Sequence, residues 1–227
     1  MATSPSIVNV DAVLDAARLR GVSLIVAICA GAILILDGLD IQVIGMAAPD
    51  LVKDFGIDRS ALAPALAAAL LGMAFGASGV GALGDRWGRR PALLASTFLF
   101  GFATVLAATS RNVTELAIWR LITGIGLGGA LPSAAALLAE FTAQRSRSQA
   151  LGAALVGVPL GGILGAALAG ELVPAYGWRA IFIVGGVLPV LAATFMYFVM
   201  PESPRMRYWC AYLRSASSSC CRRRRNC

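Results

Sequence analysis

Three ionisable side chains lie inside long apolar runs of the sequence. Asp37 and Asp40 are three residues apart, so they share one face of a helix. Arg120 lies near the start of another apolar run. Because a charged group at the centre of a membrane helix costs about 3 kcal/mol, each must face a polar cavity or a partner. We therefore predict that the three side chains line a shared polar path.

The chemistry that these residue types suit is proton-linked binding of an anion. Burial disfavours the charged form of a carboxylic acid, which suits an aspartate to take up and release a proton. Arg120 stays charged, and its planar guanidinium matches a substrate carboxylate. The alternative is a structural Asp–Arg pair that only fixes two helices. An intramembrane aspartyl protease is disfavoured, because Asp37 and Asp40 share one helix and cannot face each other from two.

Six apolar segments must position these residues, at about 22–46, 60–83, 91–109, 116–138, 150–170 and 178–200. Each is near the roughly 20 residues that cross a bilayer. Charged residues make up 14% of the chain, against roughly 25% in soluble domains. The predicted fold is an all-α membrane protein, with a six-helix transmembrane bundle over residues 21–205 and a cytoplasmic tail at 1–20.

Composition also bears on the partners. The net charge of +7 is concentrated in loops and tail, where the cytoplasmic bias of Lys and Arg near membranes explains it, so no nucleic-acid partner is inferred. The chain has no histidine, and its cysteines show no metal-ligand spacing, so we expect no metal and no cofactor beyond a coupling proton. The distribution of basic residues predicts an inner (plasma) membrane protein with both termini cytoplasmic.

A glycine-rich, charged stretch at 81–90 joins the second and third segments. Its arginines predict a cytoplasmic position, since basic loops resist translocation. Acidic and basic residues at the end of the fourth segment could pair with this stretch and latch the inner side; a plain solvated loop is the alternative. The predicted conformational gate comprises Gly81, Asp85, Arg86, Gly88, Arg89, Arg90, Glu140 and Arg147.

Small residues and one proline predict how the helices pack. Gly72 and Gly76 are four apart in the second segment and indicate a close-packing face. The glycines of the fourth segment, from Gly124 to Gly129, indicate the same. Pro159 should kink the fifth segment, because it lacks a backbone donor.

Residues 206–227 differ sharply in composition from the rest of the chain. They are rich in Ser, Cys and Arg and have no apolar periodicity, which is typical of disorder. One interpretation is a basic tail that contacts anionic lipid. We favour the other, an aberrant end such as a frameshifted or truncated reading frame.

Several motifs resemble one transporter family. Gly-x-x-x-Asp-Arg-x-Gly-Arg-Arg at 81–90 resembles the loop signature of the major facilitator superfamily, between its helices 2 and 3. Arg120-x-x-x-Gly124-x-Gly126 resembles the helix 4 signature, and Pro-Glu-Ser-Pro-Arg at 201–205 resembles the end of helix 6 in its sugar and organic-acid branches. Asp-Gly-Leu-Asp at 37–40 is similar to the Asp-Gly-x-Asp motif of the aromatic acid:proton symporters, which include 4-hydroxybenzoate and benzoate permeases.

This resemblance implies a transporter rather than an enzyme. Its expected substrate is a small aromatic carboxylate such as 4-hydroxybenzoate, taken up with a proton by rocking alternating access. Asp37 and Asp40 would carry coupling and recognition with Arg120, and Asp85 and Arg86 would govern the gate.

The family has twelve spans in two six-helix halves with the site between them, so a second half is an implied partner and this chain alone lacks half of the cavity wall. Two alternatives stay open. One is a sugar or other organic-anion porter, and the other is a non-transporting half protein that only associates with membrane partners.

Overall fold

The computed structural model describes residues 20–142 and 144–200, and all regular structure within these ranges is helical. Six spans are long and apolar enough to cross a membrane. The helices are α2 (Arg20–Phe55), η1 (Arg59–Leu62), α3 (Ala63–Trp87), α4 (Arg89–Ala107), α5 (Val113–Phe141), η2 (Gln144–Ser146), α6 (Arg147–Leu155), α7 (Gly157–Tyr176) and α8 (Trp178–Val199). The fifth span is formed by α6 and α7 together. The chain is therefore a multi-pass membrane protein with the predicted all-α fold.

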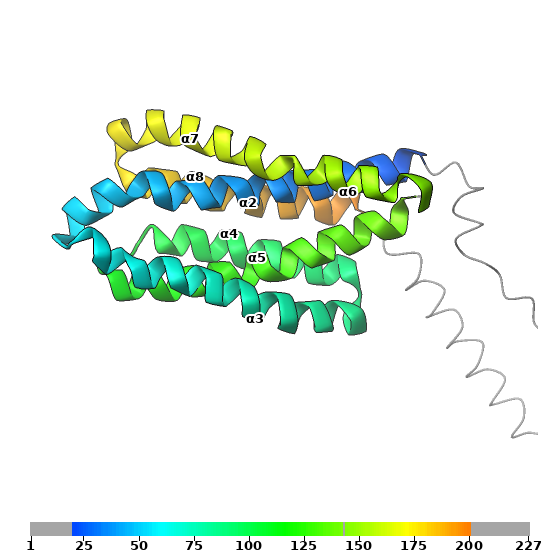
Figure 1. The fold of residues 1–227 in the computed structure, drawn as a ribbon, viewed down its shortest axis with the longest axis horizontal. Helices are drawn as coiled ribbons and strands as arrows, with labels where there is room; N and C mark the ends of the chain where they lie inside the picture. The colour runs from blue at the N-terminus through cyan, green and yellow to red at the C-terminus, as the bar shows by residue number, and fades with distance from the viewer. Residues whose placement is uncertain (1–19, 143, 201–227) are drawn as a thin grey trace, which may run out of the picture.

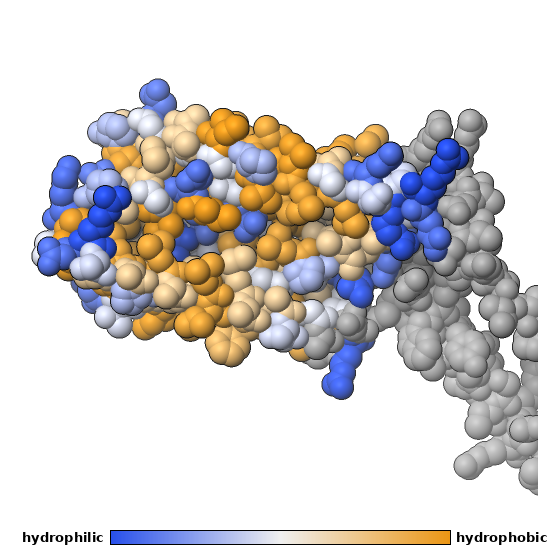
Figure 2. Space-filling view, viewed as in Figure 1, coloured by the Kyte–Doolittle hydropathy of each residue, from blue (hydrophilic) through white to orange (hydrophobic). Residues whose placement is uncertain are grey.

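The helices form two groups of three that run along the same long axis (Figure 1). One group contains α2, α7 and α8, and the other contains α3, α4 and α5. Contacts of α2 with α5 and of α4 with α8 join the groups. On the face that Figure 2 shows, hydrophobic side chains cover much of the middle of the bundle, while hydrophilic ones gather toward its ends. This is the surface of a bundle that lies in a bilayer.

Glycines allow α3 and α5 to pack backbone against backbone. A Cβ atom at Gly72 would collide with the carbonyl oxygen of Leu121, and one at Gly124 would collide with that of Ala69. Gly76 meets the backbone of Ile125 in the same way. The close-packing face predicted from the glycine spacing is confirmed. It fixes α5, and with it Arg120, tightly against α3.

The α2–α7 contact is equally close. A Cβ atom at Gly38 would collide with the carbonyl oxygen of Val158, and one at Gly161 with that of Ile35. The fifth span is interrupted at Val156, between α6 and α7. Pro159 explains the break, because it cannot donate to the carbonyl of Leu155 four residues earlier. The kink predicted from Pro159 thus corresponds to a break between two helices, three residues before the proline.

Several helix ends differ from the sequence-based prediction, among them the end of the fifth span, which lies at Tyr176 and not near 170. The first helix ends at Phe55 and not near 46, because Pro49 is accommodated within α2 and the charged residues beyond it continue the helix. The stretch 81–90, predicted to be a turn, is helical except at Gly88, which separates α3 from α4. Gly88 has a φ of 103°, a conformation that favours glycine. A single residue therefore makes the connection.

Candidate binding site between α2 and α5

An ion pair crosses the middle of the bundle between the two helix groups. The Nη1 atom of Arg120 on α5 lies 2.8 Å from Oδ2 of Asp40 on α2. Both residues are buried, with exposed fractions of 1% and 5%. Apolar clusters lie on both sides along the bundle axis, one around Leu93 and Leu137 and the other around Leu51 and Phe182. The structure thus brings together two of the three ionisable residues singled out in the apolar runs.

Asp37 lies beside this pair. It is 4% exposed, and its Oδ1 atom is buried without a hydrogen-bond partner in the described residues. Asp37, Asp40 and Arg120 all line a cavity of about 190 Å³. The remaining wall is mostly apolar and comes from α2, α3 and α5: Ile41, Ile44, Leu66, Ala69, Leu70, Met73, Thr123, Gly124 and Leu127. The cavity is therefore an apolar chamber with a charged end.

The guanidinium of Arg120 has unused hydrogen-bonding capacity. Nη1 donates to Asp40, whereas Nε and Nη2 are buried and have no partner among the residues that the structure describes. Nε and Nη2 form one edge of the guanidinium, and two parallel donors on an edge match the two oxygens of a carboxylate. A buried donor left without an acceptor costs about 1–3 kcal/mol. An anionic ligand in the cavity would remove that cost.

An aromatic ring supports Arg120 from α8. The Cζ atom of Arg120 lies 4.8 Å from the centroid of the Phe182 ring, and Phe182 is fully buried. Sequence reasoning missed Phe182, because nothing in its local sequence separates it from other apolar residues of the sixth span. It also missed the α3 side chains of the cavity, since a helix that is apolar on all sides does not reveal which face meets a site.

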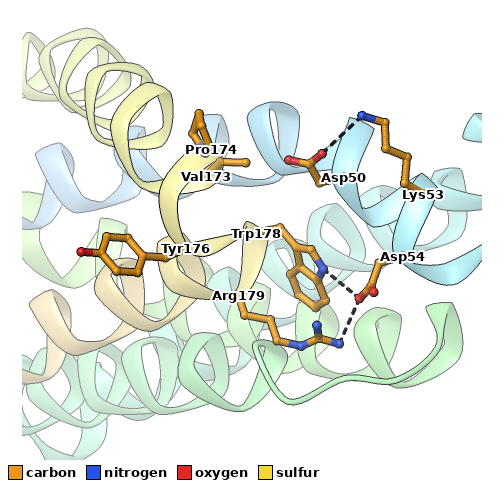
Figure 3. Close-up of a pocket in the computed structure, with 9 residues that line it drawn as sticks. Asp50, Lys53, Asp54, Val173, Pro174, Tyr176, Trp178 and Arg179 are labelled. Atoms are coloured by element: carbon orange, nitrogen blue, oxygen red, sulfur yellow. Dashed lines mark hydrogen bonds and ion pairs between the residues drawn. The ribbon is translucent and has the colours of Figure 1, made fainter.

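A second hollow, of about 530 Å³, lies where the end of α2 meets the α7–α8 turn. Figure 3 shows Asp54 in its wall, where it accepts a hydrogen bond from Nε1 of Trp178 at 3.0 Å and pairs with Arg179 at 3.0 Å. Asp50 and Lys53 form a longer ion pair of 3.7 Å beside it. The acidic and basic side chains are paired, so this cluster ties helices together rather than presenting one sign of charge.

The opposite end of the bundle contains the residues of the predicted gate. Arg89 at the start of α4 pairs with Glu140 in the last turn of α5, with Nε and Oε1 3.2 Å apart. Arg90 donates from Nη2 to the carbonyl oxygen of Tyr197 on α8 at 2.6 Å. Arg86 is exposed near the end of α3. The bundle therefore joins α4 to both α5 and α8 at this end.

The other gate residues are placed less completely. Arg147 begins α6, and Gly81 lies in α3 with open space where a Cβ would be. The side chain of Asp85 is outside the described part, as are residues 1–19 and the tail with its four cysteines, so the predictions made for them stay predictions.

The fold and this site define a class of membrane transporter. The model of the Major Facilitator Superfamily matches residues 30–211, so the chain belongs to that family. The chain is similar to the 4-hydroxybenzoate transporter PcaK of Pseudomonas aeruginosa, with 44% identity over 173 residues, 76% of this chain and 39% of the relative. It is also similar to a gallate transporter of Pseudomonas putida, with 38% identity over 76% of this chain and 38% of that protein.

Solved structures show the same architecture. A partially occluded inward-open structure of the xylose transporter XylE from E. coli matches with a TM-score of 0.72 and 25% identity, over 82% of this chain and 51% of that one. The chain spans about two fifths of the length of the curated relatives, at 39% and 38%. The family assignment made from the sequence motifs is confirmed.

Proposed function

We propose that this chain forms one wall of the binding cavity of a proton-coupled carrier for small aromatic carboxylates such as 4-hydroxybenzoate. A second six-helix half would complete the cavity and allow alternating access. The proposal includes an inner-membrane location with both termini cytoplasmic. The relatives support the substrate class, because their names include 4-hydroxybenzoate and gallate transporters.

One observation carries the proposal: Arg120 lines an apolar chamber, and its buried Nε and Nη2 atoms have no acceptor among the described residues. A carboxylate would accept hydrogen bonds from that edge, and an aromatic ring would lie against the leucine and methionine side chains of α3. Asp40 already accepts a hydrogen bond from Nη1. Asp37 is adjacent, and its Oδ1 atom has no partner in the described part of the chain, so it is our candidate for the group that carries the proton.

The cavity lining favours an aromatic acid over a sugar. A sugar presents several hydroxyl groups, and each needs a donor or acceptor when it is buried. Apart from the charged end, Thr123 is the polar side chain in the wall. Its hydroxyl already donates to the carbonyl oxygen of Trp119 at 2.9 Å. The sugar-porter alternative is therefore disfavoured, despite the structural likeness to a xylose transporter.

For the gate we propose that the Arg89–Glu140 pair holds the inner ends of α4 and α5 together. Asp85, Arg86 and Arg147 would then contact the second half in one orientation of the carrier and separate from it in the other. Gly81 and Gly88 would allow that half to approach α3 and the α3–α4 connection. These roles extend the loop signature that the sequence shares with the family.

The test is uptake of radiolabelled 4-hydroxybenzoate into vesicles under an imposed proton gradient. The chain alone is compared with the chain fused to the second six-helix half of the Pseudomonas aeruginosa relative. We expect gradient-driven uptake by the fusion, competition by benzoate and no competition by xylose. Uptake that xylose suppresses and benzoate does not would contradict the proposal.

Substitutions in the fusion test the acidic residues. Asp37→Asn and Asp40→Asn should each abolish gradient-driven uptake while the membrane level stays unchanged. Asp50→Asn is the matched control, because it makes the same change on the same helix near the outer end, where Asp50 pairs with Lys53. Normal uptake by both the Asp37 and Asp40 variants would overturn the proposed coupling role.

A further inference from the structure

A column of aromatic rings runs from one end of the bundle to Arg120. The rings of Phe55 and Trp178 have centroids 5.7 Å apart, and those of Trp178 and Phe182 are 5.6 Å apart, both edge to face. The Cζ atom of Arg120 lies 4.8 Å from the centroid of Phe182. Arg179 lies 4.4 Å above the ring of Trp178, the middle ring of the column. The column therefore contacts a buried guanidinium at Phe182 and a half-exposed one at Trp178.

Phe182 reaches Arg120 from outside the cavity wall. The cavity is lined from α2, α3 and α5, whereas Phe182 belongs to α8. Asp40 holds the Nη1 atom, and the Phe182 ring takes a position where a cation is attracted to the π-face. With those two contacts in place, Nε and Nη2 are the donors that have no partner in the described chain. Both contacts limit how the guanidinium can rotate.

The ring itself is held in place. Phe182 packs on Trp178, which is 3% exposed. The indole of Trp178 donates to Asp54 at 3.0 Å, so it cannot turn without losing that bond (Figure 3). Asp54 is tied in turn to Arg179. Residues from the ends of α2 and α8 thus fix the orientation of a ring that contacts the charged site.

We propose that Phe182 is a positioning residue, braced by Trp178 and Asp54, which holds Arg120 with its Nε–Nη2 edge directed to a substrate carboxylate. The inference rests on the proposed function, because it concerns recognition of the same carboxylate. The consequence is discrimination by charge. The ring fixes the orientation of the guanidinium, and a guanidinium in that orientation binds a carboxylate more tightly than a neutral ligand of the same shape.

The experiment measures binding of benzoate and of neutral benzamide to the full chain in lipid nanodiscs. We expect the wild-type chain to bind benzoate more tightly than benzamide. Phe182→Leu, which removes the ring and keeps an apolar side chain, should lower that preference about fivefold, mainly through benzoate. Phe182→Tyr keeps the aromatic ring and should retain the wild-type preference for benzoate. Phe141→Leu is the control, since Phe141 is also buried but lies at the far end of α5.

The outcomes separate the two proposals. No preference for benzoate in the wild-type chain would count against the proposed function. A wild-type preference that Phe182→Leu leaves unchanged would overturn the positioning role. A parallel loss of both ligands in Phe182→Leu would also overturn it, because that is the result of a merely structural role.

A ligand-free measurement gives an independent test. Phe182→Leu, Arg120→Met and the double variant form a cycle that thermal melting can follow. We expect the double variant to be less destabilised than the sum of the single changes, because each single change removes the same contact. Additive losses would show that ring and guanidinium do not stabilise each other, and the inference would fail whatever the binding data show.

Discussion

The Asp40–Arg120 pair places two opposite charges 2.8 Å apart in the buried interior of the bundle. Removing one member of a buried pair leaves an uncompensated charge, which costs about 3–5 kcal/mol. Asp40→Asn should therefore lower the free energy of unfolding by about that amount. Asp37→Asn should change it by less than about 1 kcal/mol, because the carboxylate of Asp37 makes no ion pair in the described structure and the amide has the same shape.

Thermal melting in detergent, with both variants purified in parallel, compares the two aspartates directly. Adding Arg120→Met to Asp40→Asn should recover much of the loss, since the double variant carries no unpaired charge. Equal melting temperatures for the two single variants would mean that the ion pair does not stabilise the bundle.

At the residue scale, the charged residues of the site could be predicted from the sequence, but the aromatic residue that contacts Arg120 could not. The expense of a charge at bilayer depth singled out Asp37, Asp40 and Arg120 from the sequence alone. The sequence left open which aspartate pairs with Arg120, and the structure identifies it as Asp40. Phe182 could not be found this way, because an apolar residue in a membrane helix costs nothing whichever way it points.

The α3–α5 contact is where single glycines position whole elements. Gly124→Ala would place a Cβ against the carbonyl oxygen of Ala69, and overpacking of this kind typically costs about 1–3 kcal/mol. Gly79→Ala is the matched control in α3, since no atom lies within 4 Å of the added Cβ. It should be neutral or stabilise the helix by up to about 1 kcal/mol.

Melting temperatures of the two variants test this packing. The Gly124 variant should melt below the wild type and the Gly79 variant at or above it. If the same methyl group had equal effects at both positions, the close approach of α3 and α5 would not be setting the position of Arg120.

Helix ends were the part of each element that the sequence located least well. Hydropathy locates apolar runs, so charged residues such as Asp50 and Lys53 indicate the start of a loop. In the structure these residues continue α2 because their side chains pair with one another, and Asp54 pairs with Arg179 of α8. Glycine spacing, in contrast, predicted the helix contact, because close approach is a property of the residue itself.

For the molecule as a whole, ion pairs and a hydrogen bond connect helices at three levels along the bundle. Asp54 and Arg179 link α2 to α8 at one end, Asp40 and Arg120 link α2 to α5 in the middle, and Arg90 reaches the Tyr197 carbonyl from α4 to α8 at the other end. Contacts at both ends and in the middle oppose separation of these helices from one another. Alternating access would therefore require motion against a second body rather than within this one.

The orientation of the bundle in the membrane gives a prediction for the whole chain. One end carries Arg86, Arg89 and Arg90, and basic residues near the ends of membrane spans are retained in the cytoplasm. Ser60 lies at the start of the second span and Ser148 near the start of the fifth, so three crossings separate them. Both side chains are exposed. Ser60→Cys should therefore face the outside and Ser148→Cys the cytoplasm.

Labelling with a membrane-impermeant maleimide measures this orientation. The background replaces the tail cysteines with serine and keeps Cys29, which is 3% exposed and should not react. In intact cells we expect Ser60→Cys to be labelled and Ser148→Cys to stay unlabelled, with both reacting after lysis. Because serine and cysteine are nearly the same size and uncharged, neither change alters the charge balance that sets topology. If only Ser148→Cys were labelled in intact cells, the bundle would have the opposite orientation. The Arg89–Glu140 contact would then lie outside, and the physical basis for a cytoplasmic gate would be lost.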